Sequence, residues 1–452
     1  MTRGTGLSDT IVAIATAPGR GAIGVIRVSG PDTPRIAAAV LGALPAPRRA
    51  ARRRFLDADG TVLDEGLVLY FPAPASFTGE HVLELQGHGG AVVLETVVQR
   101  LLRLGCRSAR PGEFSERAFL NDKMDVAQAE AVADLIDAGT AAAARAAVRS
   151  LQGEFSAHVH ALQSALTDLR VYVEAAIDFP EEEIDFLSST ALGDRLARIF
   201  GRFAAVTAAA RQGALLRDGL TVVIAGKPNA GKSSLLNRLV GNDVAIVTEL
   251  PGTTRDVLRE RVQLDGLPLI LIDTAGLRPA GDVVEAEGIR RARMEIARAD
   301  RLLYVVDAAT DAPRLPPDLA DIPDARKTTL VLNKIDLPGA GSLAAAEAGL
   351  TVIRVSARTG EGMEQLRDHL KTAAGYAGAD AGAFSARQRH LDALTRAERQ
   401  VEDAVTALRD TGAFELFAED LRLAQLALGE ITGEVGSEDL LAEIFGSFCI
   451  GK

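Results

Sequence analysis

One segment near the middle of the chain constrains its fold more than any other. Residues 226–233 read Gly-Lys-Pro-Asn-Ala-Gly-Lys-Ser, which satisfies the phosphate-loop pattern G-x-x-x-x-G-K-S/T. The apolar run Thr221–Ala225 precedes this loop, and residues 234–239 follow it with a helical pattern. Glycines let the backbone wrap round an anion, and the N–H groups of such a loop point at a phosphate. The order strand, glycine loop, helix therefore predicts a doubly wound α/β domain that binds a nucleotide.

The side chains of this loop suit a triphosphate and its metal ion. We expect Lys232 to act in catalysis by reaching the β- and γ-phosphate oxygens, and the Ser233 hydroxyl to bind Mg²⁺. The loop residues expected to contact the nucleotide are Asn229, Ala230, Gly231, Lys232, Ser233 and Ser234.

Three further motifs follow in the order that a Ras-like GTPase needs. Residues 273–276 form D-x-x-G at the end of an apolar run, and residues 333–336 form N-K-x-D at the end of another. The carboxylate of Asp336 can accept two hydrogen bonds from guanine, whereas adenine lacks that donor pair. A last strand and loop, residues 352–357, should lie under the base. The contacts expected from these motifs are Asp273, Thr274, Ala275, Gly276, Asn333, Lys334, Asp336, Ser356 and Ala357.

Two segments between these motifs should change with the nucleotide state. In residues 252–256 we expect Thr254 to present its hydroxyl to Mg²⁺; a plain polar loop is the alternative. Leu277 follows the D-x-x-G motif where a Ras-like enzyme aims its attacking water with Gln. Leu cannot polarise water, so Glu285 and Glu287 are candidates for that task, and a solvated helix is the other interpretation of both.

Composition restricts the functional class. At 452 residues the chain should hold about two to four domains. Its net charge of −11 argues against a broad nucleic-acid footprint. One cluster of arginines, made of Arg48, Arg49, Arg52, Arg53 and Arg54, is a candidate for a local basic patch, and a solvated loop is the better interpretation of it. The sequence has no run of about 18 apolar residues, no signal-peptide pattern, and only two cysteines. We therefore expect a cytoplasmic protein without a membrane partner.

Residues 1–122 indicate a mixed α+β N-terminal domain. Residues 19–24 match the dinucleotide pattern G-x-G-x-x-G, but β-branched residues follow where a helix should begin, so a hairpin is the better interpretation. Glu84 alternates with the apolar Leu83 and Leu85, which indicates either a polar-ligand site or a solvent-facing strand. The expected strands are Thr10–Ala15, Gly24–Val28, Gly66–Phe71 and His81–Gln86, with a helix over residues 89–104.

The remaining segments indicate an α-helical domain. It is split by an inserted G domain, so the fold class is a multidomain α/β plus α protein. A final helix should end near Gly446 and leave an extended tail, where Cys449 is either a nucleophile or a packed residue. The expected long helices are 127–138, 141–170, 191–217, 384–410 and 414–428, and the expected domains are 1–122, 123–217 (helical, first part), 218–376 (G domain) and 377–452 (helical, second part).

Together the motifs resemble the MnmE (TrmE) family of tRNA modification GTPases over essentially the whole chain. The resemblance rests on more than the phosphate loop, which many families share. The segments that carry it are Asp9–Ala13, Pro18–Gly21, Leu83–Gly90, Arg110–Ala118, Gly252–Asp256 and Cys449–Lys452.

The resemblance implies ligands that the residues alone do not. It implies an N-terminal domain that binds 5-formyltetrahydrofolate or another one-carbon derivative of tetrahydrofolate. It implies a K⁺ ion that takes the place of an arginine finger, and a water oriented by Glu285 through a second water. The implied folate contacts are Arg27, Glu84, Lys123 and Lys452, and the implied K⁺ ligands are Asn229, Thr248, Leu250 and Thr253, of which Thr248 and Thr253 also contact GTP.

The resemblance also implies partners. It implies a constitutive homodimer that joins the flavoprotein MnmG (GidA) in a heterotetramer and modifies C5 of the wobble uridine in certain tRNAs. Two other functions stay open at this point. One is a GTP-dependent ribosome-assembly factor, and the other is a folate enzyme that the G domain regulates.

Overall fold

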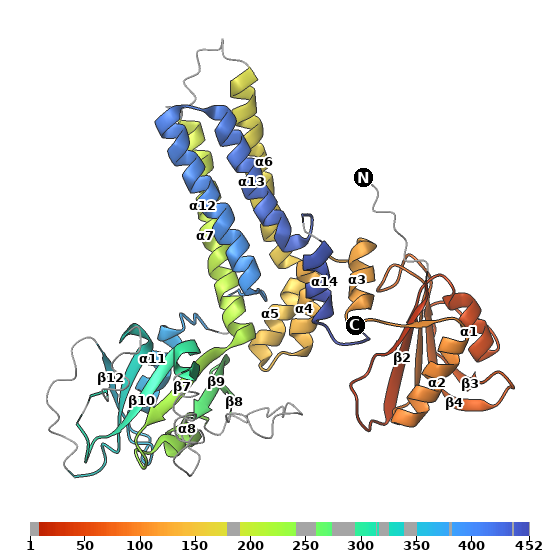
Figure 1. Ribbon diagram of the computed structural model, residues 1–452, viewed down its shortest axis with the longest axis horizontal. Coiled ribbons are helices and arrows are strands. Elements are labelled where there is room, and N and C mark those ends of the chain that lie inside the picture. Colours follow the sequence, from red (N-terminus) through yellow and green to blue (C-terminus); the bar gives the residue numbers. More distant parts are fainter. Residues whose placement is uncertain are drawn as a thin grey trace. The chain divides into compact units, whose positions relative to one another are not determined.

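The computed structural model describes most of the chain and divides it into two compact units, each with its own sheet (Figure 1). The first unit is Met1–Ala133, Ser156–Ile184 and Arg399–Lys452; the second is Asp134–Phe155 and Asp185–Glu398. The predicted α/β plus α architecture is confirmed, whereas the domain boundaries stay a prediction. The described residues are 9–178, 190–240, 259–273, 294–312, 314–315, 325–338, 350–378, 382–435 and 438–451.

The sheet of the first unit has the order β3-β4-β5-β2-β1-β6, with antiparallel neighbours except for the parallel pair β1 and β6. Alternate strand residues and apolar residues of α1 and α2 form one core, so both helices cover one face. The bounds are β1 Ile11–Ile14, β2 Ile23–Ser29, α1 Thr33–Leu41, β3 Ala51–Leu56, β4 Val62–Phe71, β5 Val82–His88, α2 Ala91–Arg103 and β6 Arg107–Ser108.

The sequence predictions for this sheet hold with one exception. All four predicted strands and the predicted helix are confirmed, and β1 and β2 form the expected antiparallel hairpin in place of a dinucleotide fold. The prediction of a loop in the arginine cluster is wrong, because Ala51–Leu56 is strand β3. Its arginines hide the strand signal, since a strand at the edge of a sheet can point charged side chains into water.

The helices largely follow the predictions, but one predicted helix is two. Residues 141–170 form α5 and α6, and the chain turns at Gly153, whose positive φ of 85° ends the first helix. α12 begins at Gln388, four residues later than predicted. The bounds are α3 Glu113–Leu120, α4 Val126–Ile136, α5 Ala141–Leu151, α6 Glu154–Asp178, α7 Thr190–Asp218, α12 Gln388–Thr411, α13 Phe414–Thr432 and α14 Glu438–Gly446.

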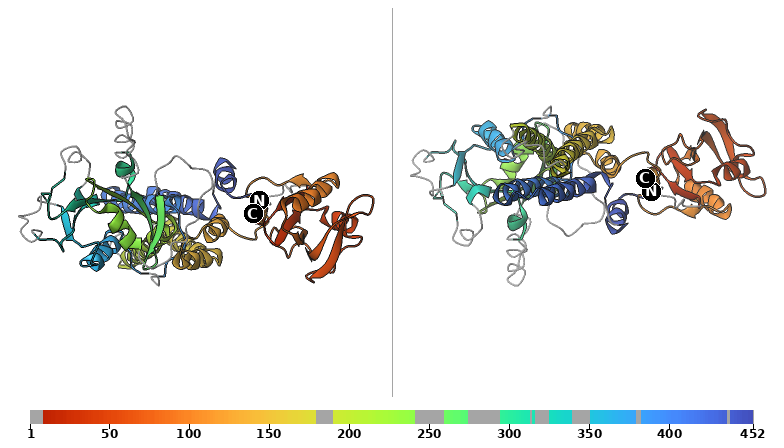
Figure 2. Two further views of the ribbon diagram at one scale, coloured as in Figure 1. Left: turned by 90° about the horizontal axis from the view of Figure 1, so that it is seen from below. Right: turned by 90° about the horizontal axis from the view of Figure 1, so that it is seen from above.

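Two long helices pack against each other within the first unit. In Figures 1 and 2, α6 and α13 lie side by side. Arg170 of α6 donates to the Gln425 side chain (2.8 Å), and Gln163 donates to Glu434 just beyond α13 (2.8 Å), so the two helices run antiparallel. After α14 the backbone turns at Gly451, where φ is 96°, instead of staying extended as predicted.

The sheet of the second unit has the order β12-β11-β10-β7-β9-β8 and is parallel except for the pair β8 and β9. Val222 and Ile224 face one core, and Val223 and Ala225 face the other, so the sheet is buried on both faces. The bounds are β7 Leu220–Gly226, α8 Lys232–Val240, β8 Arg259–Leu264, β9 Leu267–Asp273, β10 Arg301–Asp307, β11 Thr328–Asn333, β12 Thr351–Arg354 and α11 Met363–Ala373.

Within the ranges described above, no helix combines the length and the apolar character that crossing a membrane requires.

Candidate functional site

The phosphate loop connects β7 to α8, as the sequence predicts. Gly226 has φ +149°, and a Cβ there would lie 2.3 Å from the carbonyl oxygen of Val305 in the neighbouring strand β10. Only glycine therefore allows the loop to leave the sheet at this point. Lys232 is 7% exposed, and its Nζ donates to the carbonyl oxygens of Gly226 (3.0 Å) and Lys227 (2.8 Å). The ammonium group thus lies within the loop that would hold the phosphates.

Asn333 connects the phosphate loop to the loop after β12. It is the last residue of β11 and is 2% exposed. Its Nδ2 donates to the carbonyl oxygen of Ala230 (2.9 Å), and its Oδ1 accepts from the backbone N–H of Ala357 (3.0 Å). A Cβ on Gly231 would lie 2.3 Å from this Nδ2. The first residue of the N-K-x-D motif therefore joins three predicted nucleotide-binding segments.

The predicted guanine-reading carboxylate is held by a buried serine. The Ser356 hydroxyl, on a fully buried residue, lies 2.7 Å from Oδ1 of Asp336, to which it donates. The same hydroxyl oxygen accepts from the backbone N–H of Thr359 (3.0 Å). Asp336 itself is exposed, so one carboxylate oxygen is anchored while the group stays accessible to a base.

A second carboxylate, which the sequence analysis missed, holds the lysine of the same motif. Nζ of Lys334 donates to Oδ2 of Asp307 (2.6 Å), and Oδ1 of Asp307 accepts from the backbone N–H of Ala309 (3.0 Å). Burial tends to raise the pKa of Asp307, but the hydrogen bonds from Lys334 and Ala309 lower it below its ordinary value. The available signal was position, because β10 ends in Asp307 just as β9 ends in Asp273.

The same loop after β10 also contacts the phosphate loop, through an ion pair between Lys227 and Asp311. Asn229 has a left-handed backbone with φ +62°, and Ser233 and Ser234 are exposed in the first turn of α8. Asp273 ends β9 directly opposite Ile224. The predicted residues that lie outside the described ranges are Thr248, Leu250, Thr253, Thr254, Thr274, Ala275, Gly276, Leu277, Glu285, Glu287 and Lys452.

A second candidate site lies in the first unit, around Arg27. Arg27 of β2 lies directly opposite Glu84 of β5, and its Nε and Nη2 donate to Oε1 of Glu84 at 3.1 and 3.0 Å. The guanidinium carbon lies 5.6 Å from the ring centre of Phe77 and 5.7 Å from that of Phe114. Arg27 Nη1 also donates to the carbonyl oxygen of Gly451 (3.4 Å). Glu84 is thus paired, and the end of the chain comes close to this pair.

The third predicted folate contact, Lys123, and the candidate nucleophile Cys449 can also be placed. Lys123 is exposed, and its Cε would lie 3.2 Å from a Cβ on Gly79, two residues from Phe77. The Cys449 thiol is exposed, and its carbonyl oxygen accepts from the backbone N–H of Gly112 (3.4 Å). Buried Arg117 pairs with Glu80 in the loop that carries Phe77, and with buried Glu113.

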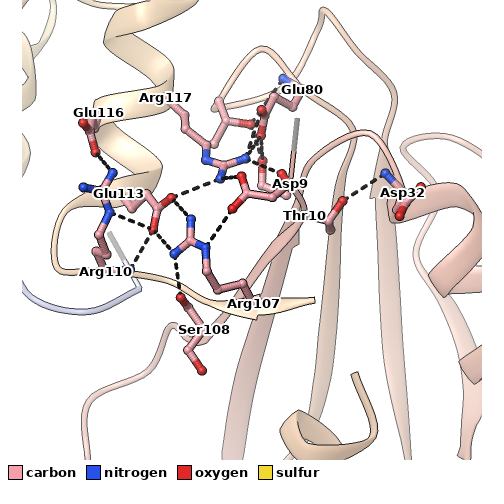
Figure 3. A network of polar contacts seen from close by, with 12 residues as sticks. Asp9, Thr10, Asp32, Glu80, Arg107, Ser108, Arg110, Glu113, Glu116 and Arg117 are labelled. Atoms are coloured by element: carbon pink, nitrogen blue, oxygen red, sulfur yellow. Dashed lines mark hydrogen bonds and ion pairs between the residues drawn. The ribbon is translucent and has the colours of Figure 1, made fainter. Parts of the chain in front are cut away.

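Figure 3 shows this buried network, which is centred on Arg117. Arg117 is 1% exposed and forms ion pairs with Asp9 (2.8 Å), Glu80 (3.1 Å) and Glu113 (3.0 Å). Glu80 in turn accepts from the Ser29 hydroxyl (2.7 Å). The network therefore ties α3 to the segment before β1 and to the loop before β5.

Glu113 is the most deeply buried carboxylate of this network, with no exposed surface. It accepts from Arg107, from Arg117 and from the backbone N–H of Arg110. Burial opposes its ionisation, but these three donors outweigh that effect and lower its pKa from 4.5 to about 2. Glu113 and Arg117 belong to the segment Arg110–Ala118, and the sequence alone predicts no role for either.

Two family models match the chain. The model described as "GTP-binding protein TrmE N-terminus" matches residues 10–123, and the model described as "MnmE helical domain" matches residues 126–449. A "tRNA modification GTPase MnmE" of Methylococcus capsulatus is 57% identical over 445 residues, which cover 98% of this chain and 99% of the relative. The protein of the same name from Sodalis glossinidius is 56% identical over 452 residues, with the same coverage. Among solved structures, the G domain of the T. maritima FeoB iron transporter is 26% identical, covers 34% of this chain and 98% of that chain, and has a TM-score of 0.26.

Proposed function

The chain belongs to the MnmE (TrmE) family of tRNA modification GTPases, and on that basis we propose that it is a K⁺-stimulated, Mg²⁺-dependent GTP hydrolase. Together with the flavoprotein MnmG it installs the (carboxymethyl)aminomethyl group at C5 of the wobble uridine in certain tRNAs. The observation that carries the nucleotide site is the position of Asn333, which bonds both the phosphate loop and the loop beneath the base.

Two side chains that would recognise the nucleotide, Lys232 and Asp336, are already positioned by hydrogen bonds. Lys232 is held by two loop carbonyl oxygens, and it exchanges these for β- and γ-phosphate oxygens when GTP enters. Asp336 is held by Ser356, so its carboxylate meets the N1–H and amine of guanine without reorganising. Adenine would leave this carboxylate without a hydrogen-bond partner, so the site should strongly reject adenine nucleotides.

Magnesium fits the residues at the edge of the phosphate loop. The hydroxyls of Ser233 and Thr254 and, through water, the carboxylate of Asp273 are hard oxygen donors of the kind Mg²⁺ prefers. Ser233 is exposed at the start of α8, and Asp273 ends the strand beside β7. A Mg²⁺ ion held by these residues would offset the negative charge of the phosphates.

Hydrolysis needs a cation beside the γ-phosphate and an oriented water. We assign K⁺ to the Asn229 side chain with the backbone carbonyls of Thr248, Leu250 and Thr253; held there, the ion would supply positive charge as the γ-phosphoryl group departs. Glu285 orients the attacking water, because Leu277 replaces the Gln that does so in Ras-like enzymes. Thr274, Ala275 and Gly276 supply the remaining contacts to the γ-phosphate.

The Arg27 region is the proposed site for a one-carbon derivative of tetrahydrofolate. Arg27 and Glu84 present a paired donor and acceptor between two aromatic rings, which suits a flat heterocycle with hydrogen-bonding edges. Lys123 and Lys452 would bind the carboxylates of the ligand. Cys449, exposed near the end of the chain, is the candidate nucleophile for the one-carbon transfer.

The chain forms a constitutive homodimer in the cytoplasm, its G domains close on GTP, and two copies bind MnmG in a heterotetramer. Closing couples hydrolysis to the arrangement of the tRNA-modifying complex, as in other switches biased by a γ-phosphate.

Two measurements test the hydrolase. GTP turnover in KCl should clearly exceed turnover in NaCl at equal ionic strength, and equal rates would remove the K⁺ mechanism. Glu285→Ala should bind GDP as the wild type does and lose most turnover, so retained turnover would remove Glu285 from the water-orienting role.

Nucleoside analysis tests the tRNA modification. tRNA from cells that lack this chain should lack the C5 group on the wobble uridine, and the intact gene, but not Lys232→Ala, should restore it. Unchanged nucleosides together with co-sedimentation of the chain with ribosomes would favour a ribosome-assembly factor instead.

A further inference from the structure

We propose that the open edge of the N-terminal sheet binds the phosphate backbone of tRNA through Arg49, Arg53 and Arg54, which we call the arginine edge. The inference rests on the proposed function in that it takes tRNA as the partner. It assigns a contact surface on this chain to that partner.

The arginine edge lies on the outermost strand of its sheet. β3 comes first in the strand order, and among the described strands it pairs with β4 alone. Arg53 and Arg54 belong to this strand and Arg49 precedes it, and all three are exposed. Pairing of Arg53 with Gly66 and of Arg54 with Glu65 fixes the backbone from which the side chains project. A paired backbone lowers the entropy lost when these side chains meet a ligand.

The two other arginines of the cluster are already engaged. Arg52 forms an ion pair with Glu65, and Arg48 stacks on Phe71 at 5.6 Å and donates to the carbonyl oxygen of Ala75. In contrast, within the residues that the structure describes, no carboxylate forms an ion pair with any member of the arginine edge. Arg53 Nη1 donates only to the neighbouring carbonyl oxygen of Arg52 (3.1 Å) among the described residues, so all three guanidinium groups keep donors for an external anion.

Nearby acids do not neutralise this surface, because each has another partner. Asp57 pairs with Arg100 (3.6 Å) and Glu65 with Arg52, whereas Asp64 accepts hydrogen bonds from the backbone N–H (2.8 Å) and the ring of His88. The charge left over along β3 is positive, although the chain as a whole carries −11. A polyanion that is repelled by the overall charge must bind at such a local surface.

The spacing of the arginines suits a phosphate polymer. Consecutive strand residues point to opposite faces and rise about 3.3 Å each, so Arg53 and Arg54 present their forks on both sides of the edge. Guanidinium forks bind phosphate oxygens in pairs, and arginines on both sides of an edge can hold neighbouring phosphates of a backbone without reading bases. The same charges also hinder pairing of exposed sheet edges, which is the competing explanation that the test must separate.

The test compares full-length variants with equal changes of charge. The edge variant carries Arg49→Gln, Arg53→Gln and Arg54→Gln. The control carries Arg198→Gln, Arg211→Gln and Arg409→Gln, three exposed arginines on α7 and α12. Binding of total tRNA is measured by fluorescence anisotropy over a range of salt concentrations. GTP turnover without tRNA and elution volume on size exclusion are recorded for each variant.

The edge variant should bind tRNA more weakly, and its plot of log affinity against log salt should be shallower by about 2 to 3. The control should keep the wild-type slope, and a second edge variant with Lys at the three positions should keep most of it. An unchanged slope in the Gln edge variant, or an equal loss in the control, would overturn the inference while leaving the proposed function in place.

Two other outcomes are also decisive. If the edge variant elutes as an aggregate while the Lys variant binds tRNA no better than it does, the arginines protect the edge and the inference is overturned. If the wild type binds no tRNA at all, both the inference and the tRNA part of the proposed function fall.

Discussion

Replacing Glu113 with Gln should destabilise the N-terminal sheet, and this loss of stability should become smaller at acidic pH. Glu113 is fully buried and accepts hydrogen bonds from Arg107, Arg117 and the backbone of Arg110. The Glu113→Gln side chain keeps the shape but cannot carry the negative charge that these donors stabilise. The substitution leaves two buried or half-buried guanidinium groups with less compensation.

The magnitude follows from the pKa of Glu113. That pKa is 4.5 in an ordinary carboxyl and about 2 in the folded protein, and one pKa unit corresponds to about 1.4 kcal/mol, so ionisation contributes about 3 kcal/mol. This is an upper figure, because the partner Arg107 is partly exposed and screened by water. A depressed pKa contributes stability above pH 4.5 and loses it as the pH falls towards 2. At pH 3 about 1 kcal/mol should remain.

Native-state hydrogen exchange of the full-length protein measures this locally. The opening free energy of amides in β1 and β2 is compared between wild type and Glu113→Gln at pH 7 and pH 3. The matched control is Glu116→Gln on the same helix, which removes one exposed ion pair with Arg110 and should cost less than about 1 kcal/mol. The reasoning would be refuted if Glu113→Gln lowered the opening free energy equally at both pH values, or by no more than Glu116→Gln does.

Two further predictions concern the nucleotide site. Gly226→Ala should abolish GDP binding in calorimetry, because its Cβ would lie 2.3 Å from a carbonyl oxygen of β10. The control Gly139→Ala, with open space around it, should bind GDP normally. Normal GDP binding by Gly226→Ala would contradict the close approach. Asp307→Asn should weaken GDP binding by about tenfold or more, since it removes the charge that holds Lys334 and a hydrogen bond to a charged group contributes about 1.5–3 kcal/mol. The control is Asp265→Asn, which breaks the ion pair with Lys371 instead. Equal affinities of these two variants would show that Asp307 does not position Lys334.

The parts of the fold that the sequence predicted are those encoded locally. Alternating or continuous apolar runs gave β1, β2, β4, β5 and β7, and the glycine spacing gave the phosphate loop, because each signal lies within one element. β3 was missed because its three arginines remove the apolar alternation, and an edge strand does not need it. The break at Gly153 was missed because one glycine within an alanine-rich segment is compatible with a continuous helix.

Features that depend on residues distant in the chain could not be predicted in the same way. The ion pair between Lys334 and Asp307 requires β10 and β11 to be neighbours, and no spacing in the sequence specifies that pair. The network of Arg117 joins residues 37 and 108 positions away, and Arg27 meets Gly451 across 424. A role for Asp336, by contrast, can be predicted from the sequence alone, because the motif that contains it is typical of guanine recognition.

The central claim is that this chain selects guanine through Asp336, and nucleotide competition tests it most directly. Titration of the wild type should show tight binding of GTP and no detectable competition by ATP or xanthosine triphosphate. Asp336→Asn should lose GTP and gain xanthosine triphosphate, because the amide can donate to the carbonyl that xanthine carries where guanine has an amine. Wild-type protein that prefers ATP, or an Asp336→Asn variant that still prefers GTP, would contradict the account.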